Sequence, residues 1–403
     1  MNSNVVGHRK RFVLVAALGA VVVAGCTNSI QGVPAPEISN VDLGTLQFGA
    51  FPHERADYVP KVVGTGRGVL IPAEARRLQN FLITPSDVDS AISRYPVLKM
   101  LTIPEDVAAQ FSPEAAAIIQ RNRLVLGVYG GRTNGDARNP KRSASSLLQF
   151  ETPDAAQRAA EELKSSYATL NPALQPASVS RVSRAITLVT DSEVYAFLAR
   201  GVYLALFRIT LPKPDRGGIE RMTTAALDLQ AAKLESLKPT PWDEMADIPS
   251  DRDAIMRRAL PATEDFDDLN LISRRDFGWY EPSGALHFER DSAHSKAAFE
   301  EAGVDVVGRQ SGVVYRAKDA ASAVRLQAQL AKPVHKDDEA VDPPTGLPDA
   351  KCVKPGDSTD NPRQYRLYCV VSRGRFVAVV GSFKDQALYE KTAAQYSILA
   401  KGE

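Results

Sequence analysis

One stretch of the chain has residue types that suit a serine-hydrolase nucleophile. Gly308-Arg309-Gln310-Ser311-Gly312 places a serine between glycines, as on the tight strand-to-helix turn that exposes a nucleophilic hydroxyl. Such an enzyme also needs a base and a pair of backbone donors near that serine. Because the spacing differs from Gly-x-Ser-x-Gly, we expect this segment to turn one strand into the next.

Histidine, the usual partner of such a serine, is scarce, with five in 403 residues. His287 lies in an alternating apolar segment, and His294 lies in the helix predicted after it. The two rings could face each other, but a zinc site needs three or four ligands at set spacing. We therefore predict structural roles for both, and solvated positions for His53 and His335.

Two clusters of charge could hold an ion. Asp337, Asp338, Glu339 and Asp342 could gather calcium, but they lack the glycine and ligand spacing of a calcium loop. We expect a solvated acidic run instead.

The second cluster is a basic, glycine-containing loop over 130–142. It carries Arg132, Arg138, Lys141 and Arg142 and could hold a phosphate or an anionic lipid head group. It lacks the lysine pattern of a phosphate loop, which favours a flexible hairpin tip. The aromatic pair Trp279-Tyr280 is either core or a recognition edge, and the sequence leaves both open.

Cys26 is the residue whose chemistry the sequence predicts best. A basic start (His8-Arg9-Lys10-Arg11) and an apolar run from Phe12 precede Val23-Ala24-Gly25-Cys26, which is the order of a secretory signal. The cysteine makes this stretch resemble a bacterial lipobox, whose thiol is acylated and whose peptide is cleaved before the cysteine. The resemblance implies a palmitate-type anchor on Cys26 and a place on the extracytoplasmic face of the cell membrane.

The other two cysteines then form an even pair. In an exported protein such a pair predicts a disulfide, here between Cys352 and Cys369. A loop of this length contributes about 3 kcal/mol through the entropy of the unfolded chain. Free buried thiols are the alternative.

The bulk composition is that of a globular protein. With 44% hydrophobic and 24% charged residues, the chain is long enough for two domains. Its formal net charge of +1 gives no basic footprint for nucleic acid. Beyond the signal, no apolar run approaches the roughly 20 residues of a membrane span. No cofactor motif is present.

The start of the mature chain resembles a known group of proteins. Residues 26–40 contain Pro34 and Pro36 and are predicted to be an extended, flexible tether. Val41-Asp42-Leu43-Gly44 and Phe51-Pro52 then resemble an uncharacterised family of lipoproteins from mycolic-acid-bearing actinobacteria. That resemblance covers most of the mature chain and implies no activity.

Two parts of the chain repeat one pattern of predicted elements. The first has a strand over 147–150, a helix over 153–167, strands over 186–189, 194–198 and 202–211, and a helix over 218–237. The second has a strand over 313–315, a helix over 319–330, strands over 365–371 and 375–381, and a helix over 384–400. Phe150-x-x-x-Asp154-Ala155-Ala156 matches Tyr315-x-x-x-Asp319-Ala320-Ala321 at an offset of 165, and Arg200-Gly201 matches Arg373-Gly374 at an offset of 173.

Outside the repeat, the apolar spacing predicts further elements. Helices are predicted over 73–82 and from Pro85 through Tyr95, and a turn of helix near Met256 and Leu260. Strands are predicted over 124–129, ending at Gly130-Gly131, and over 285–288.

The chain is therefore predicted to be α+β, with two related domains. Each would be a small, mostly antiparallel sheet packed with helices, built on a duplicated β-α-β-β-α unit. The predicted boundaries are a signal peptide at 1–25, a tether at 26–40, an N-terminal domain at 41–237, a linker at 238–267 and a C-terminal domain at 268–403 with a long loop at 332–364.

These features favour a lipid-anchored envelope protein that binds, senses or scaffolds and is not an enzyme. Its expected partners are the membrane, through Cys26, and an envelope protein or a lipid ligand. One alternative is a cell-envelope hydrolase whose site is assembled from distant segments. A lipid-binding carrier and a structural partner of a transport or secretion complex are the others.

Overall fold

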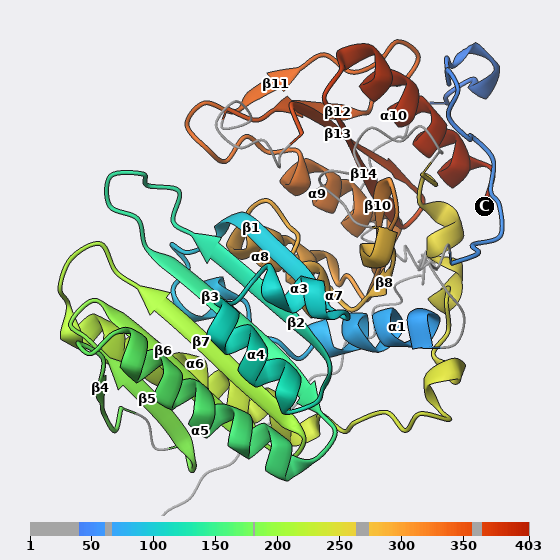
Figure 1. Cartoon of the computed structure of the whole chain (residues 1–403). Helices are drawn as coiled ribbons and strands as arrows, with labels where there is room; N and C mark the ends of the chain where they lie inside the picture. The colour runs from blue at the N-terminus through green and yellow to red at the C-terminus, as the bar shows by residue number, and fades with distance from the viewer. Residues whose placement is uncertain (1–39, 61–66, 180–181, 263–273, 357–364, 403) are drawn as a thin grey trace, which may run out of the picture. The chain divides into compact units, whose positions relative to one another are not determined.

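Two seven-stranded antiparallel sheets organise the chain (Figure 1). The computed structural model describes residues 40–60, 67–179, 182–262, 274–356 and 365–402. The first sheet contains β1 (Arg94–Leu101), β2 (Leu124–Thr133), β3 (Arg142–Phe150), β4 (Gln175–Pro176), β5 (Ala185–Val189), β6 (Glu193–Arg200) and β7 (Tyr203–Thr210). The second contains β8 (Gly278–Tyr280), β9 (Val306–Arg309), β10 (Gly312–Arg316), β11 (Glu339–Val341), β12 (Lys351–Lys354), β13 (Leu367–Arg373) and β14 (Phe376–Ser382).

The two sheets have the same topology. The first has the order β1-β2-β3-β7-β6-β5-β4, and the second, read from β8, has β8-β9-β10-β14-β13-β12-β11. Adding seven to each strand number of the first sheet reproduces the second. The predicted α+β class and the predicted duplication are both confirmed.

Helices cover both faces of each sheet. In the first half these are α3 (Pro104–Ala108), α4 (Pro113–Arg121), α5 (Pro153–Leu170) and α6 (Arg216–Ser236). In the second they are α7 (Pro282–Ala285), α8 (Ser292–Ala302), α9 (Ala320–Leu330) and α10 (Asp385–Ala400). On the first sheet α4 and α5 share an apolar cluster with one face, while α6 packs on the other. On the second sheet α8 and α9 pack on one face and α10 on the other.

Strand register corrects the alignment of the two halves. Tyr203 lies opposite Gln149, and its counterpart Phe376 lies opposite Arg316. Gln149 and Arg316 are therefore equivalent, at an offset of 167 rather than 165, and α5 and α9 also begin 167 residues apart. The sequence match was wrong by two residues, a shift that keeps every side chain on its face because the strand period is two.

The helix predicted from Pro85 through Tyr95 is only one turn long. This turn is α2 (Pro85–Val88), where the Asp87 carboxylate accepts a hydrogen bond from the Thr84 backbone N–H at 2.9 Å. Tyr95 lies in β1 with a φ of 52°, and the next residue, Pro96, has no N–H to donate inside a helix. The prediction missed β1 because Pro85 and Asp87 signal a helix start, and nothing in the local sequence shows that this helix ends after one turn.

Other boundaries also differ from the prediction. The strand predicted over 285–288 is wrong, because Pro282 starts the short helix α7 there. The first long helix, α1 (Arg67–Gln79), begins earlier than residue 73. Strand β2 continues through Gly130-Gly131 to Thr133 instead of ending there. The predicted loop over 332–364 contains the hairpin of β11 and β12.

Residues 41–60, which the sequence assigned to the N-terminal domain, pack on the second half. The Ser397 hydroxyl donates to the His53 carbonyl oxygen at 2.9 Å, and the Lys401 ammonium lies 2.8 Å from the Glu54 carboxylate. Leu46, after the short 3-10 helix η1 (Leu43–Thr45), is buried in the cluster on the α10 side.

The described part of the predicted linker, 238–262, is also packed. It forms three 3-10 turns, η2 (Met245–Asp247), η3 (Arg252–Ala254) and η4 (Met256–Arg258), and a further turn, η6 (Arg274–Asp276), leads into β8. Met256 and Leu260 are fully buried, and the turn predicted near them is confirmed. One apolar cluster runs from the α6 side of the first sheet through α1 and α7 to the α8 and α9 side of the second.

Candidate ligand-binding cleft

A cleft of about 260 Å³ lies on the α8 and α9 side of the second sheet. Its floor is made by alternate residues of neighbouring strands, which point to the same face of the sheet. These are Arg309 of β9, Val313 and Tyr315 of β10, and Val379 and Gly381 of β14.

The walls come from four distant segments. They are residues 96–99 of β1, residues 288–295 before and at the start of α8, the end of α9 with the chain after it, and the tyrosines before and within β13. The apolar and aromatic lining residues include Phe288, Leu330, Val334, Tyr365 and Tyr368. The charged ones are Lys99, Asp276, Glu289, Arg290, Asp291, Arg309 and Lys332.

Glu289 is a buried carboxyl at the wall of this cleft. The Tyr315 hydroxyl donates to Oε1 at 2.6 Å, and the Ser295 hydroxyl donates to Oε2 at 3.0 Å. Burial raises the pKa of Glu289, although the two hydroxyls and the charge of Arg309 act against that rise. Burial, together with the neighbouring carboxylate, also raises the pKa of Tyr315. Both oxygens of Glu289 are thus engaged within the protein.

Arg309 differs from Glu289 because one of its donors is not used. Its Nε is buried and has no hydrogen-bond partner among the described residues. The guanidinium carbon lies 4.0 Å from the centroid of the Phe288 ring, which fixes the position of the head group. A buried donor without an acceptor costs about 1–3 kcal/mol. A ligand oxygen in the cleft would remove that cost.

A second arginine of the wall, Arg290, is paired. Its two terminal nitrogens donate to the Asp338 carboxylate at 2.6 and 2.8 Å. Although burial alone would raise it, these bonds and one from the Gly356 N–H hold the pKa of Asp338 below its usual value. Asp338 was predicted to be solvated, and this was wrong, because the pair anchors the chain after α9 to the residues before α8.

The rest of the acidic run is on the surface. Asp337, Glu339 and Asp342 are exposed, as predicted. Within the described ranges, no group of three or more histidine, cysteine or acidic side chains is placed to hold a metal ion.

The two central histidines have structural roles, as predicted. His287 is buried, its Nε2 lies 3.1 Å from the Leu82 carbonyl oxygen, and burial lowers its pKa to about 3. Gly130 packs against this ring, where a Cβ would lie 3.0 Å from Nδ1. His294 lines the cleft, and its Nε2 lies 2.8 Å from the Gln329 carbonyl oxygen.

The two histidines predicted to be solvated are half-buried instead. His53 stacks on Phe48 with ring centroids 4.1 Å apart. His335 lies 3.7 Å from the Asp291 carboxylate, and burial lowers its pKa. Both predictions were wrong, because the segment around His53 packs on the second half and the segment around His335 packs within it.

Ser311, the serine of the sequence considered for a nucleophile, lines the cleft. As predicted, its segment turns β9 into β10, with the Gln310 N–H donating to the Gly312 carbonyl oxygen at 2.8 Å. Among the described residues, the structure records no hydrogen bond from a serine to a histidine ring.

The basic loop is not a flexible tip throughout. Arg132 is buried inside β2 and donates to the carbonyl oxygens of Ser93, at 2.6 Å, and Leu286, at 2.5 Å. Burial lowers the pKa of Arg132 to about 10. Lys141 pairs with Asp89 at 2.8 Å. The loop therefore joins the two halves of the chain, and its predicted role as a hairpin tip was wrong for Arg132.

The aromatic pair is divided between two environments. Tyr280 is fully buried, and its hydroxyl donates to the Asp276 carbonyl oxygen at 2.6 Å. Trp279 is half-buried, and its Nε1 donates to the Pro249 carbonyl oxygen at 2.6 Å. Both residues serve packing.

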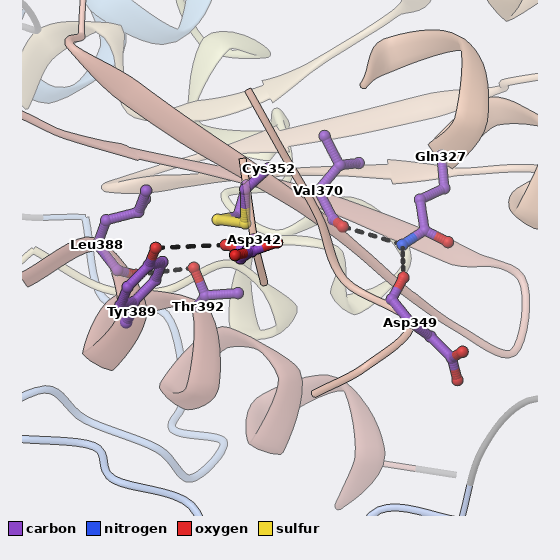
Figure 2. Close-up of a disulfide and its surroundings, with 9 residues drawn as sticks. Gln327, Asp342, Asp349, Cys352, Val370, Leu388, Tyr389 and Thr392 are labelled. Carbon is purple, nitrogen blue, oxygen red and sulfur yellow. Dashed lines mark hydrogen bonds between the residues drawn. A yellow bond between two sulfur atoms is a disulfide. The ribbon is translucent and has the colours of Figure 1, made fainter. Parts of the chain in front are cut away.

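The predicted disulfide is confirmed. Cys352 of β12 and Cys369 of β13 lie directly opposite each other and are bonded, with sulfurs 1.98 Å apart. Figure 2 shows the surroundings, where the Gln327 amide donates to the Val370 and Asp349 carbonyl oxygens, both at 2.9 Å. The Tyr389 hydroxyl of α10 donates to the Asp342 carbonyl oxygen. Cys26 lies outside the described residues.

Sequence reasoning missed the cleft because its residues are far apart in the chain. Glu289, Arg309 and Tyr315 were not singled out as a group. One signal was available: Arg309 lies on the cleft-facing side of a strand pair that is otherwise rich in valine. Polar residues on a buried face are more informative than exposed ones.

Comparison with known proteins identifies a family and one structural neighbour. The N-terminal model of the domain of unknown function DUF7373 matches residues 65–250, and its C-terminal model matches residues 255–402. The extracellular domain of PknH from Mycobacterium tuberculosis is similar at 8% identity with a TM-score of 0.27, over 43% of this chain and all of that one. No curated protein matches the sequence.

None of the helices in the described part of the chain is both long enough and apolar enough to cross a bilayer.

Proposed function

The chain belongs to the DUF7373 family, whose function is unknown, and we propose that it is an extracytoplasmic binding module anchored by lipid at Cys26. In this proposal a small ligand occupies the cleft on the second sheet. The protein binds or senses that ligand and does not transform it.

One observation carries the ligand site. The cleft combines an apolar lining with a buried guanidinium donor that has no acceptor among the described residues. Small-molecule sites are concave, mostly apolar and have a few placed polar groups. An orphaned donor in such a cavity is costly, and a bound acceptor relieves that cost.

The other groups capable of chemistry favour binding over catalysis. Glu289 accepts from Tyr315 and Ser295, so Ser295 is not available to a base. The His294 ring is held at a backbone carbonyl oxygen. A hydrolase would need one of these groups to face the substrate with its proton acceptor or donor open. This arrangement gives no support to the hydrolase alternative.

The proposed location rests on two features. The signal pattern ending at Cys26 is that of an acylated envelope protein, with the membrane as the partner of the anchor. The buried Cys352–Cys369 disulfide suits an oxidising compartment outside the cytoplasm.

Metabolic labelling tests the anchor. Cells expressing the full chain are grown with radiolabelled palmitate, and the label on the protein is compared with that on a Cys26→Ala variant. We expect the variant to lose all label and to leave the membrane fraction. Label that persisted in the variant would contradict the anchor.

Dye binding tests the cleft. The full chain carrying Cys26→Ala, purified without detergent, is titrated with 8-anilinonaphthalene-1-sulfonate, an aromatic anion. Val313→Trp fills the floor of the cleft, and Leu229→Trp adds the same side chain at an exposed site on α6. We expect at least tenfold weaker binding by Val313→Trp only. Equal affinity in both variants, with unchanged thermal unfolding, would show that the cleft is not the site.

A further inference from the structure

We infer that the ligand of the cleft is a short extended peptide with a free carboxylate, its backbone paired with the edge of β1 and its carboxylate bound by Arg309. This inference rests on the proposed function and names the class of ligand. It follows from the backbone that lines the cleft, from its charge and from its size.

The first step concerns the edge of β1. Within the described residues β1 is hydrogen-bonded to one strand only, β2, so it ends its sheet. Four consecutive residues of β1, Pro96 to Lys99, line the cleft. Successive side chains of a strand point to opposite faces, so an unbroken run reaches one cavity only when the strand presents its edge. The wall therefore contains backbone N–H and C=O groups of β1.

A strand edge selects ligands by their backbone. An extended peptide adds to such an edge as a further strand, and its main-chain hydrogen bonds supply the affinity. Pro96 has no N–H, so the pairing stretch is limited to the three residues after it. Two or three extended residues span about 7–10 Å. The site is thus suited to a short peptide segment.

The second step concerns charge. The unpaired Nε of Arg309 and the stacking of its guanidinium on Phe288 provide a fixed donor for a carboxylate. Lys99 and Lys332 add positive charge to the lining. Among the acids, Asp291 accepts from the backbone N–H groups at the start of α8. Glu289 is occupied by two hydroxyls, and the four basic side chains of the lining outnumber its three acids, Asp276 included, so the cleft favours an anion.

The third step concerns the side chains of the ligand. The floor next to Arg309 is apolar, with Val313 and Val379 side by side on paired strands. Gly381 lies under the Tyr365 ring, because a Cβ there would come within 2.1 Å of it. In a cleft of about 260 Å³, this floor suits an apolar side chain next to the bound carboxylate.

Calorimetry with three synthetic peptides tests this inference. The probes are acetyl-Ala-Ala-Val with a free carboxylate, its carboxamide, and the free acid with an N-methyl group on the central amide. Each is titrated into the full chain carrying Cys26→Ala. We expect the free acid to bind at least tenfold more tightly than either of the others, because each of those lacks one of the two proposed contacts.

Variants at Arg309 assign the carboxylate contact. Arg309→Met keeps the apolar stem and should remove the preference for the acid over the amide, while binding of the amide stays unchanged. Arg309→Lys should keep part of the preference. Arg142→Met, on the exposed end of β3, is the matched control and should behave like the parent. A preference that survives Arg309→Met, in a variant with normal thermal unfolding, would overturn the assignment.

Decanoate separates the ligand class from the proposed function. It has a carboxylate and apolar carbons but no amides. If decanoate binds as tightly as the free-acid peptide and N-methylation has no effect, the peptide inference is wrong and the cleft is still a binding site. If the dye, decanoate and all three peptides fail to bind, both the peptide inference and the proposed function are wrong.

Discussion

The two sheets have the same topology, but side chains are packed differently on the equivalent face of each sheet. On the first sheet the face under α5 is closed by side chains, and on the second the corresponding face carries the cleft. The register-equivalent pairs are Tyr129 and Arg309, Leu148 and Tyr315, and Leu206 and Val379. At these positions, the apolar or aromatic side chains of the closed face are replaced on the second sheet by polar or smaller side chains.

Helix length explains much of this difference. Helix α5 has 18 residues and α9 has 11, so α5 is about 10 Å longer. The additional turns of α5 carry Tyr167, which stacks on Tyr195 at 4.3 Å. The equivalent of Tyr195 on the second sheet is Tyr368, where α9 has already ended and the side chain lines the cleft. A duplicated fold can thus open a cleft by shortening one helix.

The largest expected effect tests the closed face against the open one. Leu206→Ala removes a buried side chain from a filled cluster and should lower the free energy of unfolding by about 2–5 kcal/mol. The equivalent change Val379→Ala should cost less than about 1 kcal/mol, because the cleft already lies beside that side chain. Urea denaturation of both variants measures this. Equal losses would mean that the two faces are packed alike.

The next effect concerns a crosslink that only the second sheet has. The residues of the first sheet that are equivalent to Cys352 and Cys369 are Thr187 and Ala196. They also lie opposite each other, but they have no sulfur to form a bridge. A Cys352→Ala/Cys369→Ala variant should lose about 3 kcal/mol of stability, since the loop of the unfolded chain is no longer closed. Thermal unfolding with and without reductant gives the value. Alkylation of both cysteines without reductant would contradict the bond itself.

The smallest effect depends on pH. Because the pKa of Glu289 is raised, the folded chain holds a proton that the unfolded chain releases, and stability should fall as pH rises from about 4.5 to the raised pKa. The slope approaches about 1.4 kcal/mol per pH unit and vanishes above that interval. Glu289→Gln should remove this slope.

Tyr167→Phe is the matched control for the pH series. Burial raises the pKa of Tyr167, so this hydroxyl of the closed face does not titrate near pH 4.5. Denaturant titrations at several pH values should therefore give parallel curves for the parent and Tyr167→Phe. A slope that remains in Glu289→Gln would assign the pH dependence to another group.

Much of the fold could be predicted, because local signals determine it. The helices after Thr152 and Asp319 begin at capping residues, and the strand pairs around Gly201 and Gly374 follow from alternation across a tight turn. The strand β1 could not be predicted, because Pro85 and Asp87 signal a helix whose length depends on what packs against it. Local sequence also could not show that residues 46–58 return to α10.

The site was harder to predict than the fold. The disulfide followed from counting cysteines, since pairing needs only an oxidising compartment. The cleft depends on where α9 ends relative to β10 and on β1 arriving from the other sheet. Both are features of the tertiary structure, and no local motif around Arg309 or Glu289 indicates them.

The contacts of residues 46–55 with α10 also determine how the protein carries load. Tension on the chain ahead of Asn40 reaches the Ser397–His53 and Lys401–Glu54 contacts before it reaches α1. The second half, which contains the cleft and the disulfide, would therefore bear a pull first, and the first half would be shielded from it. In mechanical terms, the half with the cleft is the one fastened to the chain that enters at Asn40.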